Sequence, residues 1–238
     1  MRTLRADLHI HTCLSPCAEL EMTPRALVSR ACSVGLDLIA ICDHNSAENV
    51  KAARRCAQER GLAVIGGMEV TTREEIHVLG LFHDQEAVDG AQELVHAALH
   101  GENDPVAFGE QLIVDEYDEL IGQTSKLLIG ATDFSLEETV EHIHRLGGVA
   151  VAAHIDRPSF SLISQVGFVP PDLPLDAVEL CYDELPPSAA GLPVLRSSDA
   201  HRLEEIGRHS TRFLVEAATL AELELAFRGS NGRRILDQ

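Results

Sequence analysis

Residues 23–44 read TPRALVSRACSVGLDLIAICDH and contain one complete helix–strand unit. Thr23 is a good N-cap, a proline follows it as a good first helical residue, and the next apolar residues have helical spacing. Gly35 predicts the end of this helix, and the run LDLIAIC predicts a buried strand that ends at Asp43-His44. A polar, metal-competent side chain therefore follows the predicted strand directly.

The same order of elements recurs along the chain. Residues 46–69 contain a predicted helix, a glycine stop, the strand LAVIGG and then Glu69. Residues 135–154 open with a capping box and continue as the helix EETVEHIHRL and the strand VAVAA, after which His154 follows. Other predicted strands deliver further side chains of this kind, namely His9, His11, His77, Asp199 and His201.

Helix–strand alternation predicts an α/β fold with a parallel sheet and helices outside it. In a (β/α) barrel the site lies at the carboxyl ends of several strands, where these polar side chains recur. An open doubly wound sheet usually carries a glycine-rich phosphate loop, and the sequence contains neither GxGxxG nor GxxxxGK[ST]. We therefore expect a closed or nearly closed barrel of seven or eight strands.

Residues 84–134 depart from the helix–strand alternation. They contain the helical stretch AVDGAQELVHAALH, the polar GENDP, and QLIVDEYDELIG, which is typical of a hairpin. We interpret 84–134 as an inserted cap over the barrel mouth, with 1–83 and 135–238 forming the barrel domain. The alternative is an ordinary extended connection between a helix and a strand.

Composition narrows the class of protein. A chain of 238 residues that is 45% hydrophobic suffices for one large domain with a core. It has no apolar run near the roughly 20 residues of a membrane span and no signal-peptide core at its start. We expect a cytoplasmic protein with no membrane partner, whose six cysteines are reduced thiols. Nothing in the sequence indicates the oligomeric state.

The net charge of −19 argues against long nucleic acid as a partner, because a basic surface normally neutralises phosphates. It leaves a small phosphorylated substrate open, since bound cations would dominate the field inside a pocket. We therefore expect a small phosphorylated substrate and no long nucleic acid.

Imidazole and carboxylate side chains at the predicted strand ends suit Zn, Mn or Fe. Six histidines and two carboxylates exceed the needs of one ion, so we expect two or three divalent metal ions that share bridging ligands. Such a cluster polarises a phosphoryl oxygen and lowers the pKa of bound water. The expected ligands are His9, His11, His44, Glu69, His77, His154, Asp199 and His201.

The joint pattern resembles the PHP (polymerase and histidinol phosphatase) domain family. The motifs that carry the resemblance are DLHIHT at 7–12, CDHN at 42–45, GGME at 66–69 with His77 after it, AAH at 152–154 and SSDAH at 197–201. The resemblance implies a distorted (β/α)7 TIM-like barrel with a di- or trinuclear metal centre. It also implies phosphoester hydrolysis by a small stand-alone enzyme.

The resemblance further implies how the ions are shared. One ion would be held by His9, His11, Glu69 and Asp199. Glu69 would bridge to a second ion, also held by His77 and His154, and a third would be held by His44 and His201.

Two carboxylates beside these ligands, Asp7 and Asp43, look like groups that orient imidazoles. Asp43 is also a candidate proton donor to the leaving group, and we count His201 as a candidate catalytic residue as well as a ligand. Arg157 follows His154 just beyond a strand end, where a guanidinium would bind two phosphate oxygens. The alternative for Arg157 is a salt bridge with Asp156 or another carboxylate.

Cys17 stands where many relatives have a histidine or an aspartate that completes the third site. A thiolate is a good zinc ligand, so Cys17 is a candidate ligand that would favour Zn. The alternative is that Cys17 only packs, and that Glu19 or water completes the site.

We expect a metal-dependent phosphoesterase in which a metal-bridged hydroxide attacks phosphorus, while the metals and Arg157 bind the phosphoryl oxygens. The expected substrate is a nucleotide, a short oligonucleotide end or another phosphomonoester. A histidinol-phosphatase-like enzyme is the alternative, which the insertion and Cys17 disfavour. The acidic charge disfavours an exonuclease of long DNA, and the complete ligand set disfavours a non-catalytic metal-binding regulatory module.

Overall fold

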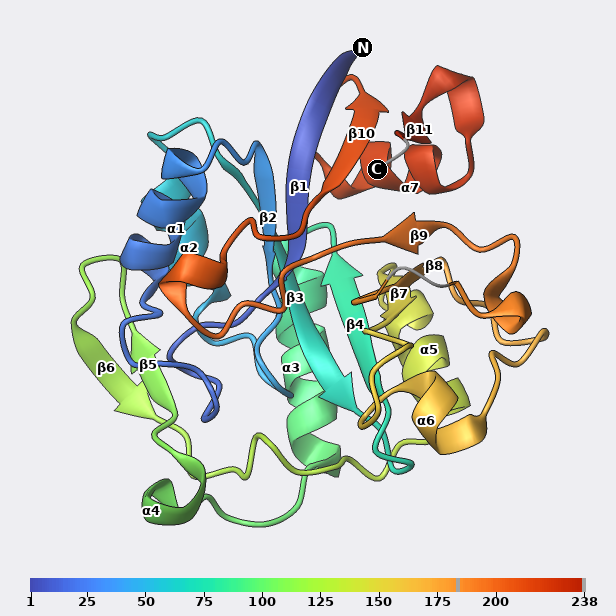
Figure 1. The fold of residues 1–238 in the computed structure, drawn as a ribbon. Coiled ribbons are helices and arrows are strands. Elements are labelled where there is room, and N and C mark those ends of the chain that lie inside the picture. Colours follow the sequence, from blue (N-terminus) through green and yellow to red (C-terminus); the bar gives the residue numbers. More distant parts are fainter. Residues whose placement is uncertain (183–184, 237–238) are drawn as a thin grey trace.

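The architecture is an α/β fold built on one strongly curled sheet, shown in Figure 1. The structure is a computed structural model that describes residues 1–182 and 185–236. Among these residues the sheet has the order β11-β10-β1-β2-β3-β4-β7-β8-β9. Its strands are β1 (Arg2–Ile10), β2 (Leu38–Ile41), β3 (Ala63–Thr71), β4 (His77–Phe82), β7 (Val149–Ala152), β8 (Ala177–Glu179), β9 (Val194–Leu195), β10 (Thr211–Val215) and β11 (Arg234–Ile235).

Helices and a hairpin complete the fold. The helices are α1 (Pro24–Ser33), α2 (Val50–Ala57), α3 (Gln85–Ala98), α4 (Pro105–Phe108), α5 (Leu136–Arg145), α6 (Leu162–Val166) and α7 (Leu220–Phe227). Short 3₁₀ turns lie at Pro187–Ala189, Leu203–Glu205 and Ser230–Gly232, and a separate hairpin pairs β5 (Leu112–Val114) with β6 (Leu120–Gln123). The helix starts predicted from Thr23 and from the Ser135 capping box are confirmed, since both side chains accept from the first helical turn.

Alternate residues of the strands enter two different cores. Ile39 and Ile41 of β2 face the core that includes side chains of α1, α2, α3 and α5. Leu38 and Ala40 face a second core, filled by side chains from most strands of the curl and from α7. A strand buried on both faces reads as a continuous apolar run, which is why LDLIAIC lacks alternation.

The predicted α/β class is confirmed, whereas a closed (β/α)7 TIM-like barrel is not. β4 runs antiparallel to both β3 and β7, and β10 joins β1 antiparallel. β4 is reversed because a tight connection at 72–76, rather than a helix, joins it to β3. After β9 the chain returns to β1, where an isolated bridge joins Ile10 to Ala200. This return brings the last predicted motif to the carboxyl end of the first strand.

The segment 84–134 has two structural parts. α3 packs on the sheet against β3 and β4, with Val88 and Val95 in the same core as α5. The part after α3 carries α4 and the β5–β6 hairpin on the outside of the fold (Figure 1). The division into a barrel domain and an inserted cap stays a prediction.

None of the helices in the described ranges is both long and apolar enough to cross a membrane.

Candidate metal centre

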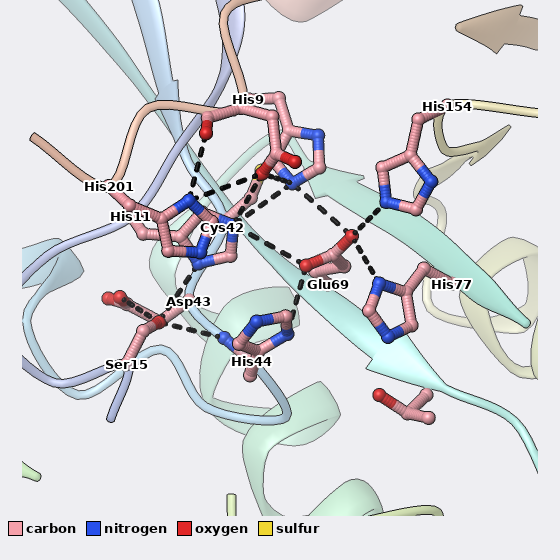
Figure 2. Close-up of polar contacts among 12 residues, drawn as sticks. His9, His11, Ser15, Cys42, Asp43, His44, Glu69, His77, His154 and His201 are labelled. Atoms are coloured by element: carbon pink, nitrogen blue, oxygen red, sulfur yellow. Dashed lines mark hydrogen bonds and ion pairs between the residues drawn. The ribbon is translucent and has the colours of Figure 1, made fainter. Parts of the chain in front are cut away.

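Imidazoles and carboxylates converge at one end of the sheet, as Figure 2 shows. The parallel strands contribute from their carboxyl ends. β4 contributes from its start, because an antiparallel neighbour of β3 places His77 opposite Thr71 at the same edge. The residues brought together are His9, His11, His44, Glu69, His77, His154, Asp199 and His201.

The first donor group surrounds the Nε2 atoms of His9 and His11, which lie 3.1 Å apart. Asp199 Oδ1 lies 3.3 Å from His9 Nε2 and 3.1 Å from His11 Nε2. Glu69 Oε1 lies 3.4 Å from His9 Nε2, and Glu69 Oε2 lies 3.4 Å from His11 Nε2. These four side chains match the set that the resemblance implies for one ion.

The second donor group shares Glu69 with the first. Glu69 Oε2 lies 2.9 Å from His44 Nδ1, and Glu69 Oε1 lies 2.8 Å from His77 Nδ1. His154 Nε2 lies 3.1 Å from the same Oε1. Glu69 therefore contacts the donors of both groups, which is the geometry of a bridging carboxylate.

The third donor group contains His11, His44 and His201. Cys17 is not a member of this group, but it lines the same cavity as His44 and His201. Although burial acts to raise it, those two rings lower the pKa of the Cys17 thiol to about 6. Glu19, the alternative donor, instead pairs with Arg202 at 3.2 Å on the surface.

The protonation pattern of the first group fits divalent cations. His9 Nδ1 donates to the Glu179 carboxylate at 3.1 Å, and although burial acts to lower it, Asp199, Glu179 and Glu69 raise the pKa of His9 well above its ordinary value. Ser15 Oγ donates to Asp43, so it accepts from His11 Nδ1 at 2.9 Å, and burial lowers the pKa of His11, so that its Nε2 carries a lone pair. Positive charge on His9, beside the His11 lone pair and two carboxylates, shows that this position favours a cation, and its donors suit a divalent metal ion.

Buried polar atoms without hydrogen bonds indicate a cation site in the second donor group as well. Within the described ranges, Glu69 Oε2 and the Nδ1 atoms of His44 and His77 are buried without a hydrogen bond of acceptable geometry. Buried polar atoms of this kind are costly unless a ligand satisfies them. The donor set of nitrogen and carboxylate oxygen is suited to Zn, Mn or Fe.

The imidazoles also keep the two carboxylates ionised. Burial acts to raise the pKa of Glu69, but His77, His9 and His44 outweigh it and hold that pKa well below its ordinary value. Burial likewise opposes ionisation of Asp199, and His9 and His11 lower its pKa. Both side chains are therefore anionic donors across the neutral range.

Asp43 lies behind His11 rather than in the cavity. Its oxygens accept from Thr12 N at 2.7 Å, Thr12 Oγ1 at 2.8 Å and Ser15 Oγ at 2.7 Å. Burial raises its pKa despite these donors. Ser15 links this carboxylate to the His11 ring, an arrangement that would orient the imidazole.

Asp7 has a different role from the one predicted. It accepts from the backbone N–H groups of Ser198 and Gly207, each at 2.9 Å. Burial raises its pKa to about 6. Asp7 therefore positions the backbone that leads into Asp199 rather than an imidazole.

Arg157 is paired with Asp199, at 2.6 Å between Nη1 and Oδ2. The alternative partner, Asp156, instead accepts from the backbone N–H groups of Cys181 and Tyr182. Arg157 thus contacts the outer oxygen of a carboxylate whose inner oxygen faces the histidines, and it retains donors for a ligand.

A cavity of about 190 Å³ opens beside these groups. Its lining residues are Cys17, His44, Glu69, His77, Ile129, Arg157, Phe160, Asp199 and His201. A larger hollow of about 580 Å³ lies between β9 and β11, and the described residues that line it include no imidazole and no carboxylate. We therefore place the candidate site in the smaller cavity.

Backbone strain is concentrated around this cavity. His154, Asp199, Asn45 and Phe160 all adopt left-handed φ values, between 30° and 54°. Each such residue costs about 1–3 kcal/mol and persists only where the surrounding structure fixes it. At Asn45, for example, the side-chain amide donates to the carbonyls of Leu128 and Gly130 at 2.8 Å, and these hydrogen bonds hold the residue in place.

The sequence did not reveal Glu179, which ends β8 and is 1% exposed. It fixes the His9 ring and also accepts from His154 N at 3.3 Å. An acidic residue inside the apolar run DAVELC was the available signal, because a buried carboxylate needs a partner.

Replacing Glu179 with leucine is expected to weaken metal binding by roughly 10- to 100-fold, because the His9 Nδ1–H loses its acceptor. Glu179→Gln keeps one acceptor oxygen and is the matched control, with a smaller loss. Calorimetric titration of the metal-free proteins with Zn²⁺ measures both. Unchanged affinity in Glu179→Leu would remove the assigned role.

Comparison with known proteins places this geometry in a family context. A family model described as PHP domain matches residues 7–164, and one described as PHP-associated matches residues 188–228. A 5′-3′ exoribonuclease of Haemophilus influenzae is 25% identical over 196 residues, covering 64% of this chain and 69% of that protein.

Two solved structures share the fold. A lesion-specific endonuclease from Pyrococcus furiosus aligns with a TM-score of 0.71 at 21% identity. Endonuclease Q in complex with a 27-mer duplex that has an abasic lesion at the active site aligns with a TM-score of 0.72 at 22% identity. Each alignment covers 98% of this chain but only 58% of the endonuclease chain.

The prediction that excluded long nucleic acid as a partner is wrong. A relative in sequence is an exoribonuclease, and a structure with this fold is bound to a DNA duplex. The net charge of −19 sums the whole surface, whereas phosphate is bound locally, where cations and Arg157 would set the field. Overall charge was therefore the wrong quantity for this question.

Proposed function

Because the chain belongs to the PHP domain family, we propose that it is a metal-dependent phosphoesterase that hydrolyses a phosphoester at the end of a nucleic-acid strand. The predicted hydrolase class is confirmed by the family match and by the relatives of that class. The observation that carries the proposal is the position of Glu69 between two donor groups, in a cavity that Arg157 also lines.

The donor groups suggest how the cations would be held. His9, His11, Glu69 and Asp199 would hold the first. Glu69 and His77, with His154 and His44 near the same carboxylate, would hold the second, and His11, His44 and His201 face a third position. Divalent cations held there would supply Lewis acidity toward a phosphoryl oxygen and would lower the pKa of a water molecule.

The chain's own residues would orient the substrate. Arg157, fixed by Asp199, would donate its remaining N–H groups to phosphoryl oxygens. His201 lines the cavity, and its Nδ1 donates to the Asp199 carbonyl at 2.9 Å. Asp43 lies outside the cavity lining, so we assign proton donation to the leaving group to His201 Nε2 in the form of the centre that holds two cations, where no third cation occupies that nitrogen.

The size of the cavity is compatible with the terminal phosphoester of a nucleic-acid strand. A volume of about 190 Å³ is below the range of roughly 300–1,000 Å³ for pockets that enclose a small-molecule ligand. It accommodates a phosphoryl group and the atoms that flank it, so the rest of the substrate would lie outside. The 5′-3′ exoribonuclease named among the relatives supports a terminal phosphoester of RNA, and the DNA-bound structure supports testing DNA as well.

A substrate panel tests this proposal. With Mn²⁺ or Zn²⁺ added, we expect turnover of 5′-phosphorylated single-stranded RNA or DNA, with release of mononucleotides from one end. Nucleoside monophosphates, histidinol phosphate and a duplex with an abasic site complete the panel. Turnover of histidinol phosphate alone, or of none of these substrates, would contradict the proposal.

We propose Cys17, which lines the cavity together with His44 and His201, as the additional donor at the third position. Cys17→Ala is then expected to purify with one metal equivalent fewer than the unaltered protein, measured by plasma mass spectrometry. Cys32→Ala, on the half-buried side of α1, is the matched control and should keep full metal content. Equal metal content in both variants would restrict Cys17 to packing.

A further inference from the structure

Phe160 is an aromatic side chain held at the edge of the cavity rather than in a core. It lines the cavity and is 40% exposed. Its ring stacks on His77, with centroids 5.0 Å apart and planes inclined by 24°. Because His77 packs against one face, a ligand would approach the ring from its other face or its edge.

The backbone fixes the position of this ring. Phe160 has a φ of 54°, a left-handed conformation that is rare for a bulky residue. Its carbonyl accepts from His77 N at 3.1 Å, and Ser161 Oγ donates to the Arg157 carbonyl at 2.6 Å. The loop that holds Arg157 at the phosphate position therefore also holds Phe160 beside it.

Ile129 is a second apolar side chain at the same cavity, and it comes from a distant segment. It is 38% exposed, although both of its neighbours in sequence are fixed by the Asn45 amide. Asn45 directly follows His44 in sequence. Its side-chain amide therefore ties the segment that carries Ile129 to the segment that carries His44. Two anchored, partly exposed apolar residues thus lie beside the candidate phosphate position.

We propose that Phe160 and Ile129 form a nucleobase-binding subsite, in which the base of the terminal nucleotide packs on the exposed part of the Phe160 ring. A base presents a flat π-face that stacks on aromatic side chains largely independently of sequence. This subsite rests on the proposed function, because it needs the nucleotide's phosphate at the donor groups. It gives the cavity a preference for nucleotides over other phosphoesters.

Shielding of His77 is the competing role for Phe160. If Phe160 only shields His77 from solvent, its replacement by leucine or alanine would change the affinity for every substrate equally. If Phe160 stacks on a base, the replacement would weaken only the binding of substrates that carry one. The two roles therefore separate when one protein is tested on two probes. The ratio of the two affinities is independent of how much of the preparation is folded or metal-loaded.

The probes are two 5′-phosphorylated DNA hexamers that differ only in the terminal nucleotide, which is either intact or abasic. Their dissociation constants are measured by fluorescence anisotropy, and their kcat/KM values in a second assay. We expect the unaltered protein to prefer the intact probe by roughly 5- to 100-fold, the range that base–aromatic stacking supplies. Phe160→Ala should reduce this ratio to near one, and Phe160→Trp should preserve it.

Two further variants complete the test. Phe168→Ala removes a 50% exposed phenylalanine that does not line the cavity, and it should keep the full preference. Ile129→Ala should reduce the preference in part, and it tests the subsite even where Phe160→Ala fails to fold.

The possible failures are distinct. A preference that survives in Phe160→Ala, or turnover of both probes by the unaltered protein at equal efficiency, overturns the subsite alone. An unaltered protein that turns over neither probe nor any RNA overturns the proposed function together with the subsite.

Discussion

Replacing Glu69 with glutamine is expected to lower phosphoester turnover by roughly 10³-fold, since cations of this kind supply several kcal/mol and each 1.4 kcal/mol is tenfold. The Glu69 carboxylate lies within 3.4 Å of five imidazole nitrogens, from His9, His11, His44, His77 and His154. A neutral amide removes the charge that both donor groups share and turns one acceptor oxygen into an N–H donor.

The loss should appear first as a loss of metal. Mass spectrometry of the purified Glu69→Gln protein should find fewer metal equivalents than in the unaltered protein. Glu59→Gln, an exposed position just past α2, is the matched control and should change neither quantity. A fully loaded and fully active Glu69→Gln protein would remove Glu69 from the centre.

Replacing Asp199 with asparagine is expected to give the second largest effect, a loss of roughly 10²- to 10³-fold in turnover. Asp199 Oδ1 lies against His9 and His11, while Oδ2 accepts from Arg157 at 2.6 Å. The amide therefore weakens the first cation position and also releases the guanidinium from its fixed orientation.

Two variants separate these contributions. Arg157→Met should keep the metal content and raise KM, because it removes only the proposed phosphate contact. Asp133→Asn alters an exposed aspartate that pairs with His100 at the surface, and it is the matched control for the charge change. Asp199→Asn with the activity of Asp133→Asn would contradict the assignment.

The sequence predicted much of the fold through local signals. Thr23 and Ser135 cap helices as expected, and the apolar runs after those helices form β2 and β7. Strand direction was not predictable in the same way, because an apolar run has the same pattern whether its strand runs parallel or antiparallel. For that reason the reversal of β4, and with it the departure from regular alternation, appears only in the structure.

The candidate site was predictable to the extent that its side chains stand at strand ends. His44 and His154 follow β2 and β7, and His77 reaches the same edge from the start of a reversed strand. Glu179 and Ser15 were missed because their roles depend on contacts with residues of other segments. Glu179 contacts His9 across 170 positions of sequence, which no local pattern encodes.

Titration of the metal-free protein with Mn²⁺ or Zn²⁺, with turnover of a 5′-phosphorylated oligonucleotide measured at each step, tests the central claim most directly. The claim is that the His, Glu and Asp cluster acts through bound divalent cations. We expect no turnover without metal and a rise that reaches its plateau at two or three equivalents. Full turnover by protein shown to be free of metal would contradict the account.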